Sequence, residues 1–173
     1  MKFLKSYTGG MVVLAVVIVL SVLLGSRRSL VSERSKVEAQ FAPIAGDLQD
    51  CLDITANLLT VAGRYLDASE LAALEGSRNM LSDWHGISNG YTAYTRLQEE
   101  AAAVLDELEE CELTEKDRAY VQGFRTDLAS EADTISRDGY NDAAEEFNRK
   151  VLGAFPANIL SKLTFVGSAE LFA

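Results

Sequence analysis

The stretch VEAQFAPIAGDLQDCLDITANLLTVAGRY, residues 37–65, decides the fold because its apolar residues recur at alternating intervals of three and four. The stripe is formed by Val37, Phe41, Ile44, Leu48, Cys51, Thr55, Leu58, Ala62 and Tyr65. This spacing places one apolar face along a helix, as in a helical bundle or a coiled coil. Pro43 and Gly46 fall inside the stripe, so we expect a bend there.

The rest of the chain continues this periodicity. The stripe carries on through Leu71, Leu74, Met80, Leu81 and Trp84; a second contains Tyr94, Leu97, Ala101, Val104, Leu108 and Cys111; a third contains Val121, Phe124, Leu128, Ile135, Tyr140, Phe147 and Val151. Pro156 cannot lie inside the third helix, and the apolar residues 158–172 are expected to form a short helix. The sequence therefore predicts an all-α fold, an antiparallel up-and-down bundle of three long helices plus a short C-terminal helix.

Two helix starts carry capping signals. Asp67 and Glu70 have the spacing of a capping box, and Thr114 is a candidate N-cap with Asp117 three residues on. The first reversal of the chain is expected either near residue 67 or near residue 87.

The run TGGMVVLAVVIVLSVLLG, Thr8–Gly25, contains 18 residues without a charge. As a helix it would be about 27 Å long, close to the hydrocarbon thickness of a bilayer. A cleaved signal peptide is the alternative, but cleavage after Gly25 would place Leu23 where the peptidase prefers a small residue. We expect a short tail at residues 1–7, a transmembrane anchor at residues 8–25 and a helical-bundle domain at residues 26–173.

The charges around the apolar run leave the orientation of the anchor open. Lys2 and Lys5 precede the run, whereas Arg27, Arg28, Arg34 and Lys36 follow it. The positive-inside rule counts lysine and arginine, so it favours a cytoplasmic C-terminal side by a small margin.

The part of the chain after the run is strongly acidic. Two of the 16 basic residues precede the run, so residues 26–173 carry 14 basic residues against all 26 carboxylates, a net charge of about −12. Such a surface repels nucleic acid and anionic lipid, and neither is an expected partner of this part.

The segment GISNG, residues 86–90, matches the G-x-S-x-G pattern of serine hydrolases and follows His85, the only histidine. A nucleophile elbow needs a strand before its serine. Here helices are expected on both sides, and glycine and asparagine are common at helix ends. We therefore interpret the segment as a connection between helices and expect no catalytic residues.

The sequence also predicts no metal site, no cofactor and no disulfide. One histidine and two distant cysteines make no zinc site, E-x-x-H pairs are missing, and no glycine-rich phosphate loop is present. Cys51 and Cys111 would lie about 18 to 40 Å apart along the bundle, far beyond the roughly 4.4–6.8 Å that a bridge spans.

The C-terminal segment RDGYNDAAEEFNRKVLGAFPANILSKLTFVGSAELF, residues 137–172, resembles the signature of the LemA family of small bacterial membrane proteins. The matching residues are Arg137, Tyr140, Asn141, Phe147, Asn148, Phe155, Pro156 and Asn158. In the first helix LDITANLLTVAGRY resembles a second family segment, through Asp53, Asn57, Leu58 and Tyr65. The chain departs from the family pattern at Ala56, where the family has proline, and at Thr164-Phe165, where Gly-Phe is expected.

The resemblance implies a non-enzymatic scaffold or adaptor in the bacterial plasma membrane, with other membrane proteins such as a membrane protease as partners. The alternative is a single-pass sensor or signalling module, which is disfavoured because no second span or transmitter pattern follows. From the residues themselves, Asn141 and Asn148 share one helix face beside Tyr140 and Phe147. They could fix packing register or simply lie at the helix surface.

The position of the first reversal also bears on self-association. If the chain reverses near 86–90, the helix at residues 91–112 is about 33 Å long and the stretch 31–84 about 80 Å. The membrane-proximal half of the first stripe would then be uncovered, and a second copy is its expected cover. If the chain reverses near Asp67, a monomer suffices.

Overall fold

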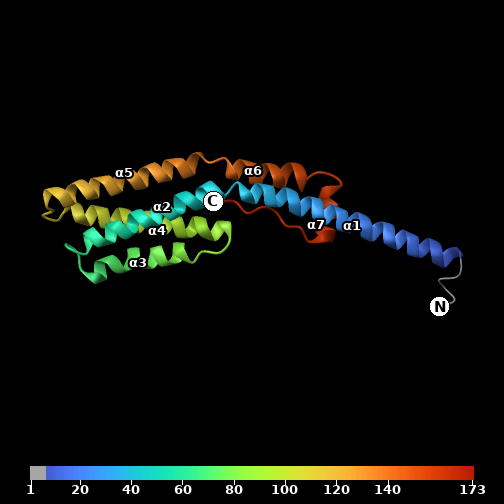
Figure 1. The fold of residues 1–173 in the computed structure, drawn as a ribbon, viewed down its shortest axis with the longest axis horizontal. Coiled ribbons are helices and arrows are strands. Elements are labelled where there is room, and N and C mark those ends of the chain that lie inside the picture. The colour runs from blue at the N-terminus through green and yellow to red at the C-terminus, as the bar shows by residue number, and fades with distance from the viewer. Residues whose placement is uncertain (1–6) are drawn as a thin grey trace. The chain divides into compact units, whose positions relative to one another are not determined.

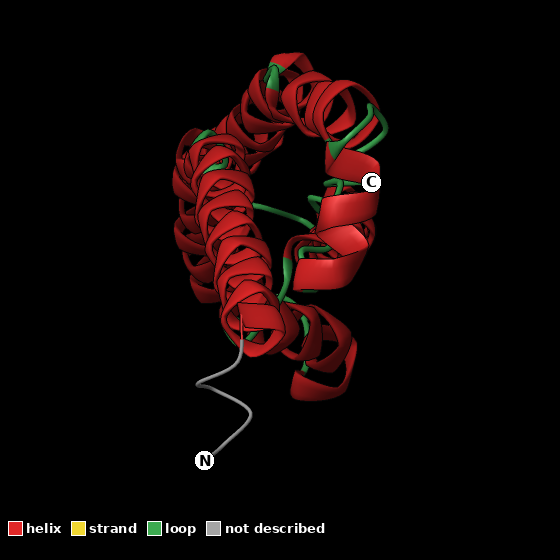
Figure 2. Ribbon diagram, turned by 90° about the vertical axis from the view of Figure 1, so that its right-hand side faces the viewer, coloured by secondary structure: helices red, strands yellow, loops and turns green. Residues whose placement is uncertain are grey.

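The computed structural model describes residues 7–173, and this part of the chain is helical, with turns and extended connections but no strand (Figures 1 and 2). The all-α prediction is therefore confirmed. The expected N-terminal tail, with Lys2 and Lys5, lies outside the described residues except for Tyr7.

The described chain contains two compact units. The first comprises the chain up to Gln40 together with Asp142–Ala169, and the second comprises Phe41–Asn141 together with Glu170–Ala173. Each unit is considered by itself below.

The first unit is organised along α1 (Tyr7–Ala39), the long blue helix of Figure 1. α7 (Ala157–Thr164) packs along α1, and η2 (Phe147–Val151), a single turn of π-helix, also contacts it. Among the described residues, one helical stretch, Gly9–Ala62, is long and apolar enough to cross a membrane. Its best 18-residue window has a mean hydropathy of 2.5.

The second unit is a four-helix bundle. Its helices are α2 (Ala42–Ala62), α3 (Ala68–Ser82), α4 (Ile87–Glu109) and α5 (Glu115–Arg137). α2 packs on α5 and α3, and α4 packs on α3 and α5. Because short turns join consecutive helices, the bundle runs up and down.

The number of bundle helices differs from the prediction. The chain reverses both near residue 67 and near residue 87. Residues 31–84 belong to three helices rather than to one, because two breaks interrupt them. The first break is a turn at Gln40–Phe41, directly before Pro43 at the start of α2. The second break is the turn at residues 63–67, which ends with the N-cap of α3.

The C-terminal part also differs. The third stripe is interrupted at Asp138–Gly139, after which α6 (Tyr140–Glu146) begins a new helix. The helix expected within residues 158–172 ends at Thr164, because Phe165 adopts a left-handed conformation with φ of 56°. The chain after Phe165 carries no regular structure.

The predicted apolar stripe forms the core of the second unit. Phe41, Ile44, Leu48 and Cys51 are each no more than 6 % exposed, because helices of the same chain pack around α2. Burial raises the pKa of the Cys51 thiol to about 12. From Phe41 onward the stripe is thus covered by helices of the same chain, which is the arrangement expected for a reversal near Asp67, and self-association stays a prediction.

Both predicted caps are confirmed. The Asp67 carboxylate accepts hydrogen bonds from the backbone N–H of Ser69 and of Glu70, and the Glu70 carboxylate accepts from the Asp67 N–H. The Thr114 hydroxyl accepts from the Asp117 N–H at 3.1 Å. These bonds satisfy N–H groups that would otherwise lack partners at the starts of α3 and α5.

Tyr65 joins the turn after α2 to the start of α5. Its hydroxyl donates to Asp117 Oδ2 at 2.6 Å, and Arg64 Nη1 donates to Asp117 Oδ1 at 2.7 Å. The Asp117 side chain is buried. The hydrogen bond from Tyr65, followed by that from Thr114 and the charge of Arg64, holds the pKa of Asp117 below its usual value.

We predict that Tyr65→Phe destabilises the bundle at neutral pH and that this effect shrinks in acid. A carboxyl whose pKa is lowered by folding stabilises the fold above its unfolded pKa, and the contribution is lost as the pH falls through the lowered value. Urea unfolding midpoints, measured from neutral pH down to about pH 3, test this. The control is Tyr120→Phe, since Tyr120 is exposed on α5. A pH-independent effect of Tyr65→Phe would contradict the prediction.

Candidate functional site

The residues singled out by the sequence do not gather in one place. Asp53, Asn57, Arg137, Phe155 and Pro156 are exposed. Asp53 accepts a hydrogen bond from Gln49, and Arg137 forms an ion pair with Asp133. Pro156 follows a cis peptide bond at the start of α7. Tyr65 contacts a turn of the bundle, and Tyr140, Asn141 and Asn148 contact the C-terminal segment. Phe147 is buried, and the enclosed side-chain oxygen of Asn158 has no hydrogen-bond partner.

In the second unit, Asn141 binds the backbone of the chain end. Its side-chain Nδ2 donates to the Phe172 carbonyl at 2.9 Å, and its Oδ1 accepts from the Phe172 N–H at 2.8 Å. A side-chain amide offers one donor and one acceptor side by side, so it pairs with a peptide group as a neighbouring strand would. This role differs from both expectations for Asn141, because the amide holds the chain end rather than setting the register of two helices or lying free at a helix surface.

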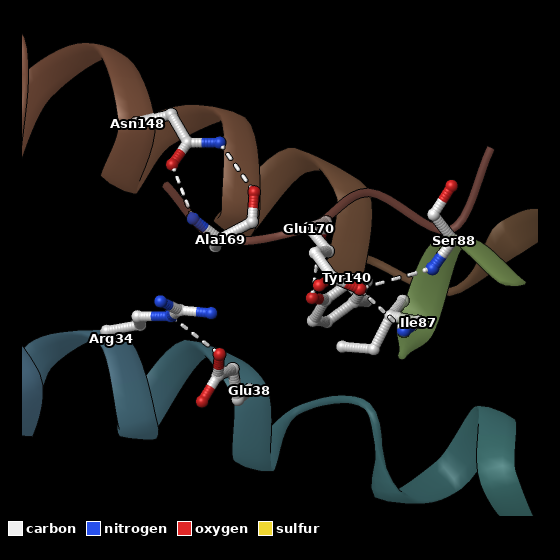
Figure 3. A network of polar contacts seen from close by, with 8 residues as sticks. All are labelled: Arg34, Glu38, Ile87, Ser88, Tyr140, Asn148, Ala169 and Glu170. Carbon is white, nitrogen blue, oxygen red and sulfur yellow. Dashed lines mark hydrogen bonds and ion pairs between the residues drawn. The ribbon is translucent and has the colours of Figure 1, made fainter. Parts of the chain in front are cut away.

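In the first unit, Asn148 makes the same pair of bonds with Ala169. The distances are 2.9 Å from Nδ2 to the carbonyl and 2.8 Å from the N–H to Oδ1 (Figure 3). The preceding residue, Phe147, is buried. Each Tyr-Asn or Phe-Asn pair therefore combines a buried ring with an amide that holds extended backbone.

An aromatic cluster surrounds the end of the chain in the second unit. The Phe172 ring lies 5.2 Å from Tyr91, 5.4 Å from Phe41 and 6.0 Å from Tyr94, centroid to centroid. Tyr140 is 1 % exposed, and its hydroxyl donates to the Glu170 carbonyl at 2.7 Å. The chain end thus completes the core of this unit.

Glu170 caps α4 from a distant part of the sequence. One of its carboxylate oxygens accepts from the Ile87 N–H at 2.7 Å and from the Ser88 N–H at 3.4 Å, as Figure 3 shows. A negative charge at the amino end of a helix is stabilised by the unpaired N–H groups and the helix dipole. Gly86, with φ of 83°, turns the chain into this helix.

The second glycine of GISNG is explained by packing. Gly90 lies in the first turn of α4, and a Cβ there would come within 2.8 Å of the Trp84 indole. The segment GISNG is therefore the start of a helix rather than a link between two helices, because α4 already begins at Ile87.

The serine and histidine of the motif do not form a nucleophile and base in the described structure. The Ser88 backbone N–H donates to Glu170, and the His85 carbonyl accepts from the Asn89 side chain. Both Ser88 and His85 are exposed, and the preceding element is a helix.

Three carboxylates meet between α2 and α5. Asp47, Asp50 and Glu131 each offer an oxygen within 4.8 Å of the others. Partial burial, followed by repulsion between the neighbouring carboxylates, raises the pKa of Asp47 and of Glu131. Exposed acidic groups of this kind are common without an ion.

Sequence reasoning missed Glu170 and Phe172. No spacing rule connects Glu170 to Ile87, which lies 83 residues earlier.

Comparison with protein-family models, with curated proteins and with solved structures finds no match to this chain. The resemblance to the LemA family therefore rests on the motif residues quoted above.

We predict opposite effects for two Gly→Ala substitutions. Gly90→Ala forces the Trp84 ring to move and is expected to cost about 1–3 kcal/mol of stability. At Gly76, on the exposed face of α3, a Cβ meets nothing within 4 Å. Gly76→Ala should therefore stabilise by about 0.5–1 kcal/mol through helix propensity. Urea unfolding followed by Trp84 fluorescence measures both, and two changes of the same sign would refute the packing role of Gly90.

We also predict that Asn141→Asp loosens the chain end. The substitution places a carboxylate oxygen against the Phe172 carbonyl, and the expected cost is about 1–3 kcal/mol. Asn57→Asp is the matched control, because Asn57 is exposed on α2. Unfolding midpoints and cleavage of the C-terminal residues by carboxypeptidase provide the measurement. Equal behaviour of the two variants would show that the Asn141 amide pair is dispensable.

Proposed function

We propose that this chain is a single-pass, membrane-anchored helical-bundle protein of the LemA type, which serves as a non-enzymatic scaffold or adaptor for proteins of the bacterial plasma membrane. α1 supplies the anchor, and the bundle of the second unit supplies the surface that partners contact.

The proposal that α1 is a membrane anchor rests on its exposed apolar surface. Its side chains are each 41–67 % exposed; they are Met11, Val12, Val13, Leu14, Val16, Val17, Ile18, Val19, Leu20, Val22 and Leu24. Apolar surface left in water costs roughly 25 cal/mol for each Å², and in the described chain only the last turns of the run, near Leu23, lie beside another element, α7. A bilayer removes that cost.

The scaffold role is supported by what four residues of the resemblance do here. Tyr65, Tyr140, Asn141 and Asn148 make hydrogen bonds to backbone groups and to Asp117 within the protein. These bonds support the fold, as a scaffold requires. Partners would be other membrane proteins, such as a membrane protease, or a second copy brought close by anchoring in the same membrane.

We predict that the full chain stays with membranes after alkaline carbonate washing and keeps residues 1–25. The matched variant is Val16→Arg with Ile18→Arg, since each arginine at the centre of a span costs about 2.5–3.5 kcal/mol of insertion. This variant should appear in the wash. N-terminal sequencing that began near Ser26 would contradict the anchor, as would equal extraction of both proteins.

The adaptor role is tested by purification of the tagged chain from native membranes in mild detergent, followed by size analysis and identification of co-eluting proteins. The proposal expects a membrane protein that co-elutes in a defined ratio with the wild-type chain. The arginine variant, which keeps the bundle but not the anchor, should lose it. A chain that elutes alone in several mild detergents, after cross-linking in intact membranes, would count against the role.

A further inference from the structure

The burial pattern of α7 is the reverse of that usual in a water-soluble protein: its hydroxyl side chains are buried and its large apolar side chains are exposed. Ser161 and Thr164 are 7 % exposed, and their hydroxyls donate to backbone carbonyls of the same helix. Ile159 and Leu163, four residues apart on the other face, are 51 % and 58 % exposed. A helix that packs on a protein in water normally buries its large apolar side chains and exposes its hydroxyls.

Exposed aromatic residues stand on both sides of α7 in the sequence, and Phe165 shares a hollow with Leu163. Phe155 precedes the helix and is 79 % exposed, and Phe165 follows it and is 94 % exposed. Contiguous exposed apolar residues of this size mark an interaction surface. The partner must therefore be apolar over a length of at least two helical turns.

The position of α7 along α1 identifies that partner. The start of α7 shares a hollow with residues just beyond the apolar run of α1; its lining is Ser26, Ser29, Leu30, Pro156, Ala157 and Leu160. The end of α7 shares another with the last turns of the run; its lining is Leu20, Leu23, Leu24, Arg27, Leu163, Thr164 and Phe165. α7 therefore descends along α1 towards the apolar run, and Phe165 lies beside the run itself.

Basic side chains occur at the same level. Arg27 lines the hollow with Phe165, and Lys162 is exposed on α7. Long basic side chains keep their charge among lipid headgroups while their methylene stems lie against apolar groups. Apolar side chains beside basic ones are the composition of a helix that lies in the membrane interface.

We propose that α7 is a second membrane-contacting element, which inserts Ile159, Leu163 and Phe165 among the lipids of the bilayer that α1 crosses. This inference rests on the anchor proposed above. The strong negative charge of the chain does not oppose it, because the contact is with acyl chains and zwitterionic headgroups and needs no anionic lipid. We propose the bilayer rather than a second copy as the partner of this face, because α7 packs against α1, the helix that enters the bilayer.

The test places a nitroxide on single cysteines in the full chain, reconstituted in phosphatidylcholine vesicles. The background is Cys111→Ser, with Cys51 left in place because it is buried. The labelled variants are Ile159→Cys and Leu163→Cys on α7, with Val16→Cys as the control inside the span and Met80→Cys, exposed on α3, as the control in water. Collision rates with oxygen and with a water-soluble nickel chelate are compared.

The proposal expects an oxygen-to-nickel ratio at Ile159 and Leu163 several-fold above that at Met80 and below that at Val16, which lies deeper in the span. If both α7 positions behave like Met80 while Val16 behaves as buried in lipid, the inference about α7 is overturned and the anchor stands. If Val16 itself is accessible to nickel, the anchor fails and the inference fails with it. Spin–spin broadening at Leu163, without access for oxygen, would assign the face to a second copy and overturn the lipid contact.

Discussion

The Asn141 side chain pairs with the Phe172 backbone through two hydrogen bonds, and the position of the chain end in the second unit depends on this pairing. It fixes the last residues so that the Phe172 ring fills the space beside Phe41 and the Glu170 carboxylate reaches the start of α4. In this position Glu170 accepts from two N–H groups in the first turn of α4, and the Phe172 ring contacts three rings of the aromatic core. The non-helical chain end thus supplies the cap of α4, because Glu170 pairs with the N–H groups that lack partners within the helix.

Local patterns in the sequence predicted local structure. The heptad stripe, the capping box at Asp67 and the N-cap at Thr114 each depend on residues within a few positions of one another, and each is present in the fold. Features that depend on distant residues were missed. The cap from Glu170 and the contact of Gly90 with Trp84 arise only once the chain has folded. The number of helices was wrong because periodicity continues smoothly across the tight turn at residues 63–67.

The cost of leaving apolar surface in water accounts for the packing of the bundle, and it also makes the exposed surface of the first unit notable. In the second unit every helix of the bundle covers an apolar stripe of another, and the buried carboxylate of Asp117 is paired by Tyr65 and Arg64. In the first unit the apolar side chains of α1 and α7 face outward. The exposed apolar surface is compatible with a membrane span, whereas the bundle buries its apolar residues within itself.

The central claim is that the chain end completes the bundle, and amide hydrogen exchange tests it most directly. In the Asn141→Asp variant, which breaks the pairing with the Phe172 backbone, we expect exchange at the Ile87 and Ser88 amides to accelerate several-fold, because Glu170 is no longer held over them. The Asp117 amide, which donates to Thr114 at the start of α5, should keep its wild-type rate. Unchanged exchange at Ile87, or equal acceleration at Asp117, would contradict a specific role for the chain end.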